Sequence, residues 1–126
     1  MRVFTSKTFA RFQRRERITD RTLCAVVDEA ERGLIDADLG GYLIKLRLAR
    51  RGQGKSGGYR VLLAYRVGDL AIFLYGFAKS ERDNIDDDEV ALLRERAGQL
   101  LADMDGIEAM IADDRMREVY CAEIQD

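Results

Sequence analysis

The chain contains no histidine, no proline and no tryptophan, and only two of its 126 residues are cysteines. Without histidine, no side chain titrates near neutral pH unless its surroundings shift its pKa, so acid–base chemistry would fall to Lys, Arg, Tyr, Asp or Glu. Without histidine or a Cys-x-x-Cys pair, a zinc site is not expected. We therefore expect no metal and no cofactor.

Long apolar runs are also missing. No uninterrupted run approaches the roughly 20 residues that cross a bilayer, and residues 1–7 lack the apolar core and the cleavage site of a secretion signal. We expect a cytoplasmic protein with no membrane contact. Cys24 and Cys121 are then expected to be reduced thiols, although the sequence leaves a disulfide between them open.

The length fits a single domain, residues 1–126, and its charge is unevenly distributed. Residues 45–82 contain nine Lys or Arg against two Asp or Glu, a net of +7, whereas residues 83–126 contain four against fourteen, a net of −10. The basic stretch predicts a polyanionic partner. If the acidic residues 103–126 lie near the rim of the basic stretch, they would weaken the binding of such a partner. The alternative is that they lie on the far side and only favour solubility.

Helical and extended periodicities alternate along the chain and predict an α+β fold. Apolar residues recur at helical spacing after a capping Thr19 or Asp20, but alternate with Lys45 and Arg47 later on. Gly68–Asp69 predicts a tight turn between two β-rich runs. The predicted strands are residues 2–7, 42–48, 59–67, 70–79 and 117–121, and the predicted helices are residues 8–16, 20–32, 86–101 and 107–111. The middle three strands should form an antiparallel meander, with the second helix packed on it.

Strand pleating predicts a basic face on this meander, because side chains two residues apart share a face. Lys45 then shares a face of its strand with Arg47, and Phe73 shares a face of its strand with Tyr75. If the helices cover only one side of the sheet, the other side would collect Lys45, Arg47, Arg60 and Lys79. Cations with an aromatic ring among them suit phosphates and stacked bases. The other interpretation is a solvated face that binds no ligand.

Two further motifs do not indicate a site. The Gly-rich stretch around Lys55 lacks the four-residue spacer of a P-loop and does not open a helix. The acidic run Asp86–Glu89 lies where a helix begins, and there the helix dipole favours negative charge.

Three short stretches are informative through their order and spacing. They are Ile-Lys-Leu-Arg at 44–47, Gly-Tyr-Arg-Val-Leu at 58–62, and Tyr-Gly-Phe-Ala-Lys-Ser-Glu-Arg-Asp-Asn-Ile at 75–85. Together they resemble the RelE/HigB-like toxins of type II toxin–antitoxin systems, and most closely the HigB-like branch. The resemblance extends from the first strand to the helix after Asp86.

This resemblance implies a RelE-like fold, with N-terminal helices packed on a curved antiparallel sheet and a C-terminal helix. It also implies a ribosome-dependent mRNA endonuclease (an mRNA interferase) that a cognate antitoxin neutralises. That antitoxin is expected to be of the helix-turn-helix type, and operator DNA would be bound only through it. Lys45, Arg47 and Arg60 match working cations of the family, whereas Ser80 and Asp86 stand where the family has an Arg and a Tyr.

A metal-independent cleavage would use the ribose 2′-OH of the substrate as the nucleophile. In this hypothesis Lys45 is the base and Arg60 stabilises the transition-state charge. The candidate catalytic residues are Lys45, Arg47, Arg60, Lys79 and Arg82. The candidate RNA-binding residues are Arg50, Arg51, Lys55, Tyr65, Arg66 and Tyr75. Arg60 is expected to be exposed, so that its removal would leave the fold intact.

The absent Arg and Tyr leave two alternatives open. The protein would be a non-catalytic interaction module, such as a ParE-like inhibitor that binds gyrase, or a decayed toxin kept for its complex with the antitoxin. Cut mRNA would favour the nuclease, and DNA breaks with an SOS response would favour the gyrase inhibitor.

Overall fold

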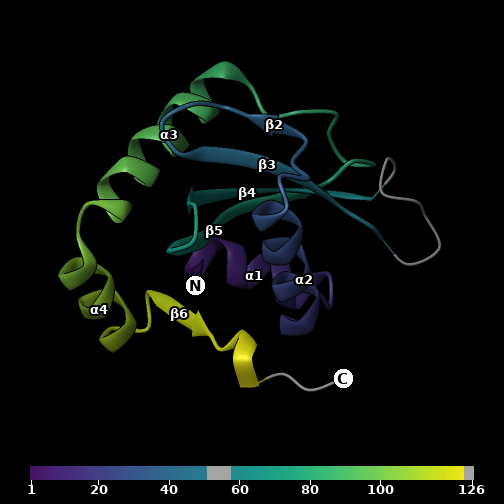
Figure 1. Cartoon of the computed structure of the whole chain (residues 1–126). Helices are drawn as coiled ribbons and strands as arrows, with labels where there is room; N and C mark the ends of the chain where they lie inside the picture. The colour runs from purple at the N-terminus through teal and green to yellow at the C-terminus, as the bar shows by residue number, and fades with distance from the viewer. Residues whose placement is uncertain (51–57, 124–126) are drawn as a thin grey trace.

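A computed structural model describes residues 1–50 and 58–123, and this part of the chain contains six strands and four α-helices (Figure 1). The strands are β1 (Arg2–Ser6), β2 (Ala37–Asp38), β3 (Leu43–Leu48), β4 (Tyr59–Arg66), β5 (Leu70–Ala78) and β6 (Met116–Val119). The helices are α1 (Lys7–Arg15), α2 (Asp20–Glu31), α3 (Asp87–Leu101) and α4 (Met104–Ala112), and a short 3-10 helix, Cys121–Glu123, follows β6. The predicted α+β fold is therefore confirmed.

The strands form one sheet in the order β2-β3-β4-β5-β1-β6. Strands β3, β4 and β5 pair antiparallel in consecutive order, as the sequence predicted. Strand β1 runs parallel to β5 and antiparallel to β6, so the sheet is mixed rather than wholly antiparallel. Because β1 lies between β5 and β6, the C-terminal strand occupies the sheet edge farthest from β2.

The helices begin at side chains that accept hydrogen bonds from free backbone N–H groups. The Ser6 side chain caps α1, and that of Thr19 caps α2, one of the two residues predicted for this role. Asp86 caps α3 in a reciprocal pair with Glu89, so the acidic run is used in starting the helix. None of the helices in the described residues is both long and apolar enough to cross a membrane.

Helices pack against both faces of the sheet. Helices α1 and α2 bury Phe9, Leu23 and Val26 against one face, where Val61 of β4 is fully buried. Helices α3 and α4 bury a second apolar cluster on the other face: Ala97, Leu100 and Ile107 with Leu62, Ala64 and Ile72. The expectation that helices cover only one side is therefore wrong. On this second face, cationic side chains of the strands are accessible to a ligand only beyond the part of the sheet that α3 covers.

A β-bulge in the β4–β5 pairing sets which aromatic residues share a face. Leu62 pairs with Tyr75, but Leu63 pairs with Phe73, so β5 carries one extra residue between them. Phe73 consequently packs against Phe9 of α1, with ring centroids 4.9 Å apart, while Tyr75 packs with the cluster on the opposite face. The predicted shared face of Phe73 and Tyr75 is thus wrong.

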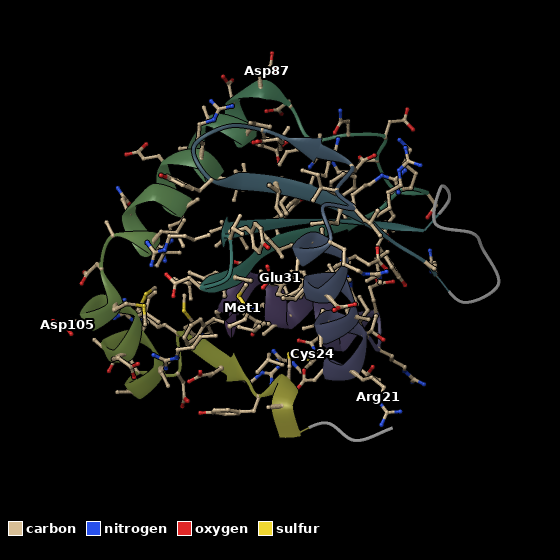
Figure 2. All side chains as sticks on the ribbon, in the orientation of Figure 1. Met1, Arg21, Cys24, Glu31, Asp87 and Asp105 are labelled. Atoms are coloured by element: carbon tan, nitrogen blue, oxygen red, sulfur yellow. A yellow bond between two sulfur atoms is a disulfide. The ribbon has the colours of Figure 1, made fainter. Side chains whose placement is uncertain are left out.

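The acidic C-terminal segment does not approach the basic face in its described part. Strand β6 lies at the far edge of the sheet, beside β1, and Asp105 of α4 lies away from β2 and β3 (Figure 2). Its carboxylates pair there, since Glu108 and Glu118 both bind Arg2. The expectation of shielding by residues 103–126 is therefore wrong for residues up to 123, because β-pairing carries them to the other edge.

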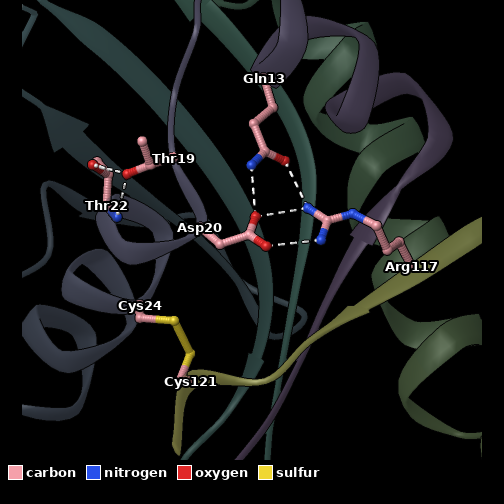
Figure 3. The surroundings of a disulfide bond; sticks show 7 residues. All are labelled: Gln13, Thr19, Asp20, Thr22, Cys24, Arg117 and Cys121. Atoms are coloured by element: carbon pink, nitrogen blue, oxygen red, sulfur yellow. Dashed lines mark hydrogen bonds and ion pairs between the residues drawn. A yellow bond between two sulfur atoms is a disulfide. The ribbon is translucent and has the colours of Figure 1, made fainter. Parts of the chain in front are cut away.

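The two cysteines form a disulfide, which corrects the expectation of reduced thiols. Cys24 lies on α2, and Cys121 follows β6, with Cα atoms 5.6 Å apart despite a sequence separation of 97 (Figure 3). Beside the bond, the Arg117 guanidinium donates to both carboxylate oxygens of Asp20 and to Gln13 Oε1, at 2.8–3.0 Å. The pairing of β6 with β1 brings these distant segments together.

Candidate nucleic-acid interface

Three cations lie together on the part of the sheet that α3 leaves open. Lys45 and Arg47 point to the same face of β3, and Arg47 lies directly opposite Arg60 of β4. Like charges directly opposite on neighbouring strands repel each other. A nearby anion is therefore needed to hold this cluster together, either from the protein or from a ligand.

Asp36, just before β2, supplies that anion. Arg47 Nε donates to its Oδ1 at 2.8 Å, while its Oδ2 lies 3.6 Å from Lys45 Nζ and 3.9 Å from Arg60 Nε. Burial alone would raise the pKa of the Asp36 carboxyl, but the hydrogen bond from Arg47 and the three positive charges outweigh it and lower the pKa. No pattern in the sequence marks Asp36 as a site residue, because only the pairing of the two-residue strand β2 with β3 brings it to the cluster.

Arg60 is buried rather than exposed, with 6% of its surface accessible. Its Nη1 donates to the Tyr59 carbonyl oxygen at 3.2 Å, and its Nε faces Asp36. Its aliphatic stem is thus packed while its head is held in the cluster. The expectation of a fully solvated strand-face arginine is wrong, and replacing Arg60 is no longer expected to leave stability untouched.

A second group of polar side chains joins this cluster through Asn84. Lys45 Nζ lies 3.4 Å from Asn84 Oδ1, and Arg82 Nε donates to the Asn84 carbonyl oxygen at 2.9 Å. Arg82 also donates to Tyr75 Oη and forms a bidentate pair with Glu89. The hydrogen bonds from Arg82 lower the pKa of Glu89 to about 2. Asn84 therefore connects the cluster of Lys45, Arg47 and Arg60 to Arg82. Each of these two groups contains one carboxylate, that of Asp36 in the first and that of Glu89 in the second.

The remaining candidates are distributed unevenly. Lys79 lies at the end of β5, where its Nζ donates to the Asp83 carbonyl oxygen at 2.7 Å. Arg50 Nη1 lies 3.3 Å from Ser80 Oγ, and its guanidinium sits over the Tyr59 ring. Arg51 and Lys55 lie outside the described residues.

Two predicted RNA-binding residues are not brought to the cluster. Tyr65 faces α2, where its hydroxyl donates to Glu31 at 2.6 Å, and burial together with this bond raises the pKa of Tyr65 to about 12. Arg66 lies at the far end of β4 and binds Asp69 and the Leu101 carbonyl oxygen. Pleating separates Tyr65 from the cluster, and distance along the strand separates Arg66.

A family model described as the RelE toxin of the RelE / RelB toxin-antitoxin system matches residues 1–119. The chain belongs to the RelE toxin family. No curated protein and no solved structure gives a significant match. This RelE-family chain is thus a toxin of the toxin–antitoxin class, and its family implies an antitoxin as a partner.

Two positions distinguish this RelE-family chain from the pattern that the resemblance implies. Ser80 stands in place of an Arg, but the Arg50 guanidinium reaches the Ser80 hydroxyl from the end of β3. Asp86 stands in place of a Tyr and serves as the N-cap of α3, while Tyr75 places a hydroxyl next to Arg82. Both chemical groups are thus present nearby, supplied by other residues. Within residues 1–50 and 58–123, no group of three or more His, Cys, Asp or Glu could hold a metal ion.

Replacing Asp36 with Asn is expected to lower the free energy of unfolding by roughly 1–3 kcal/mol at neutral pH, because the cluster loses its anion. The folded-state pKa of Asp36 is below its unfolded value, so this stabilisation is present above the unfolded pKa and is lost as pH falls through the folded pKa. Urea unfolding of both proteins from about pH 7 to pH 2 should show the difference shrinking below about pH 4. Asp28→Asn is the matched control, since Asp28 is exposed and pairs with Arg32. A difference independent of pH would contradict the assignment.

Proposed function

We propose that this RelE-family toxin cleaves mRNA on the ribosome through the ribose 2′-OH, without a metal ion, in the cytoplasm. A cognate antitoxin, expected to carry a helix-turn-helix domain, would neutralise it. The observation that carries the proposal is the cluster of Lys45, Arg47 and Arg60 around a single carboxylate, with Arg47 as its exposed member. A carboxylate held by two guanidiniums and an ammonium marks a place where a phosphate oxygen could bind in the same way.

In this reaction the 2′-oxygen attacks the adjacent phosphorus, and the bond to the 5′-oxygen of the next nucleotide breaks. A base takes the 2′-OH proton, an acid protonates the 5′-oxygen, and cations stabilise the charge on the phosphorane. Arg47 and Arg60 can donate to the two non-bridging oxygens. Lys79, on the adjoining loop, is the candidate acid for the leaving oxygen.

Lys45 is the base in this proposal, the role that the sequence hypothesis gave it, and it would first have to lose its proton. Asp36 Oδ2 lies 3.6 Å from Lys45 Nζ. Because Asp36 occupies the position proposed for a phosphate oxygen, its carboxylate would have to leave the cluster when the substrate binds.

Tyr75 would hold a base next to the scissile nucleotide. It lies in the same row across the sheet as Lys45, with Leu62 between them. Two strand spacings place the two side chains about 10 Å apart, within reach of one or two nucleotides. Arg82 and Arg50 would contact the flanking phosphates.

The decisive experiment uses translating ribosomes and a reporter mRNA with and without one 2′-deoxynucleotide at the mapped cleavage position. We expect the unmodified mRNA to be cut, leaving a 2′,3′-cyclic phosphate and a 5′-hydroxyl, and the 2′-deoxy mRNA to remain intact at that position, because it lacks the nucleophile. Equal cleavage of both would rule out this chemistry. Growth arrest with intact mRNA, DNA breaks and an SOS response would instead favour a gyrase inhibitor, the alternative that Ser80 and Asp86 support. No effect on growth, mRNA or DNA would favour a decayed toxin.

A further inference from the structure

A second surface lies on the face of the sheet that carries α1 and α2, beyond the end of α2. Three large apolar side chains are exposed there: Ile35 (36%), Tyr42 (63%) and Val67 (79%). Ile35, Tyr42 and Val67 line a single hollow of about 490 Å³, with Ile44 and Tyr65 also in its wall. Exposed apolar side chains that gather around one hollow are typical of a binding surface for another protein.

The backbone at Tyr42 supports a functional role for this surface. Gly40, Gly41 and Tyr42 have positive φ angles of 82°, 57° and 67° in succession. Glycine adopts this conformation freely, but a bulky side chain rarely does. Tyr42 therefore presents an exposed ring from a backbone conformation that disfavours it, and such outliers often occur at binding sites.

The charge around the hollow indicates which partner would fit. The Glu31 carboxylate accepts from the Tyr65 hydroxyl and the Gly68 N–H, and Asp38 accepts from the Gly40 N–H. Neither carboxylate forms an ion pair within the described residues, whereas the nearby arginines Arg32, Arg47 and Arg66 pair with other acids. Arg94, beside Gly40 and Gly41, donates to the Leu39 carbonyl oxygen. A two-fold contact with a second copy would bring the carboxylates of Glu31 and Asp38 together. A partner with apolar side chains flanked by Lys or Arg is complementary to the hollow and these carboxylates.

We propose that this hollow, bounded by Ile35, Tyr42 and Val67, binds a segment of the antitoxin, with an apolar side chain inside it and basic side chains on Glu31 and Asp38. The identity of the partner rests on the proposed function. The hollow is on the opposite face of the sheet from Arg60, so the bound segment leaves the cation cluster uncovered. However, Ile35 in the hollow adjoins Asp36 in the cluster. A partner that immobilises residues 34–38 therefore keeps the Asp36 carboxylate between the cations and opposes its displacement by phosphate.

The test measures binding of the purified product of the adjacent gene to the full chain by calorimetry. Val67→Asp and Tyr42→Gly are each expected to weaken binding by at least tenfold, because apolar anchors dominate such contacts. Both should fold, since Val67 is highly exposed and glycine suits the positive φ at position 42. Leu92→Asp is the matched control, an equally exposed apolar residue on α3, and should bind as the wild type does. Wild-type affinity should also fall as salt rises.

Equal affinity of all four proteins for the adjacent-gene product would overturn the proposal, as would the absence of any binding to the wild type. A wild-type dimer that Val67→Asp converts to a monomer would also overturn it, in favour of a second copy as the occupant. Cleavage of mRNA by the free variants separates the two proposals. If Val67→Asp and Tyr42→Gly lose the antitoxin but still cut mRNA, both proposals are supported. If none of the proteins, including the wild type, cuts mRNA while the binding differences persist, the proposed function fails and the surface stands.

Discussion

Replacing Arg60 with Gln is expected to reduce the rate of mRNA cleavage about 10²–10³-fold, the usual effect of removing one preorganised donor to transition-state charge. Arg60 is buried and held by the Tyr59 carbonyl oxygen and by Asp36, so its guanidinium is positioned before any substrate arrives. Such fixed donors require little reorganisation during the reaction. Single-turnover cleavage on translating ribosomes measures the rate directly.

The control for Arg60→Gln is Arg32→Gln, which removes the same charge from an exposed arginine beyond the end of α2. We expect it to cleave mRNA at the wild-type rate. Because Arg60 is buried beside Asp36, the Arg60→Gln protein should also be less stable, so cleavage is compared well below its melting temperature. A folded Arg60→Gln protein with wild-type cleavage would show that the cluster does not act on RNA.

Reduction of the Cys24–Cys121 disulfide is expected to lower the free energy of unfolding by about 4–5 kcal/mol. The bond closes a loop of about three quarters of the chain, since the two residues are 97 positions apart. In the chain-entropy account, cross-links that close long loops restrict the unfolded chain most. Urea unfolding with and without a reducing agent measures the difference. The reduced form is the one that a reducing cytoplasm would maintain.

A double variant, Cys24→Ser with Cys121→Ser, separates the bond from other effects of the reducing agent. Its free energy of unfolding should match that of the reduced wild type and should not respond to the agent. If the wild type exposes two titratable thiols after reduction and still unfolds at the same urea concentration, the bond does not stabilise the fold. The Asp20–Arg117–Gln13 hydrogen bonds would then be sufficient to hold the C-terminal segment against α2.

Much of the fold could be predicted because its signals are local. Alternating side chains around Lys45 and Arg47, the turn at Gly68–Asp69 and the cap at Thr19 each depend on residues a few positions apart. The common face of Lys45 and Arg47 follows from pleating alone. For this reason the meander, the helices and the grouping of two site cations were already evident from the sequence.

The rest depended on contacts between distant segments. Asp36 joins the cluster only because β2 pairs with β3, and the bulge in β5 reverses the face of Phe73. Cys121 meets Cys24, and the acidic segment leaves the basic face, only because β6 pairs with β1. The sequence by itself determined the elements other than β2 and two cations of the site, since periodicity and capping act within a few residues. Strand order and register decided which carboxylate neutralises the cluster and which face stays open, because those depend on the packing of the whole chain.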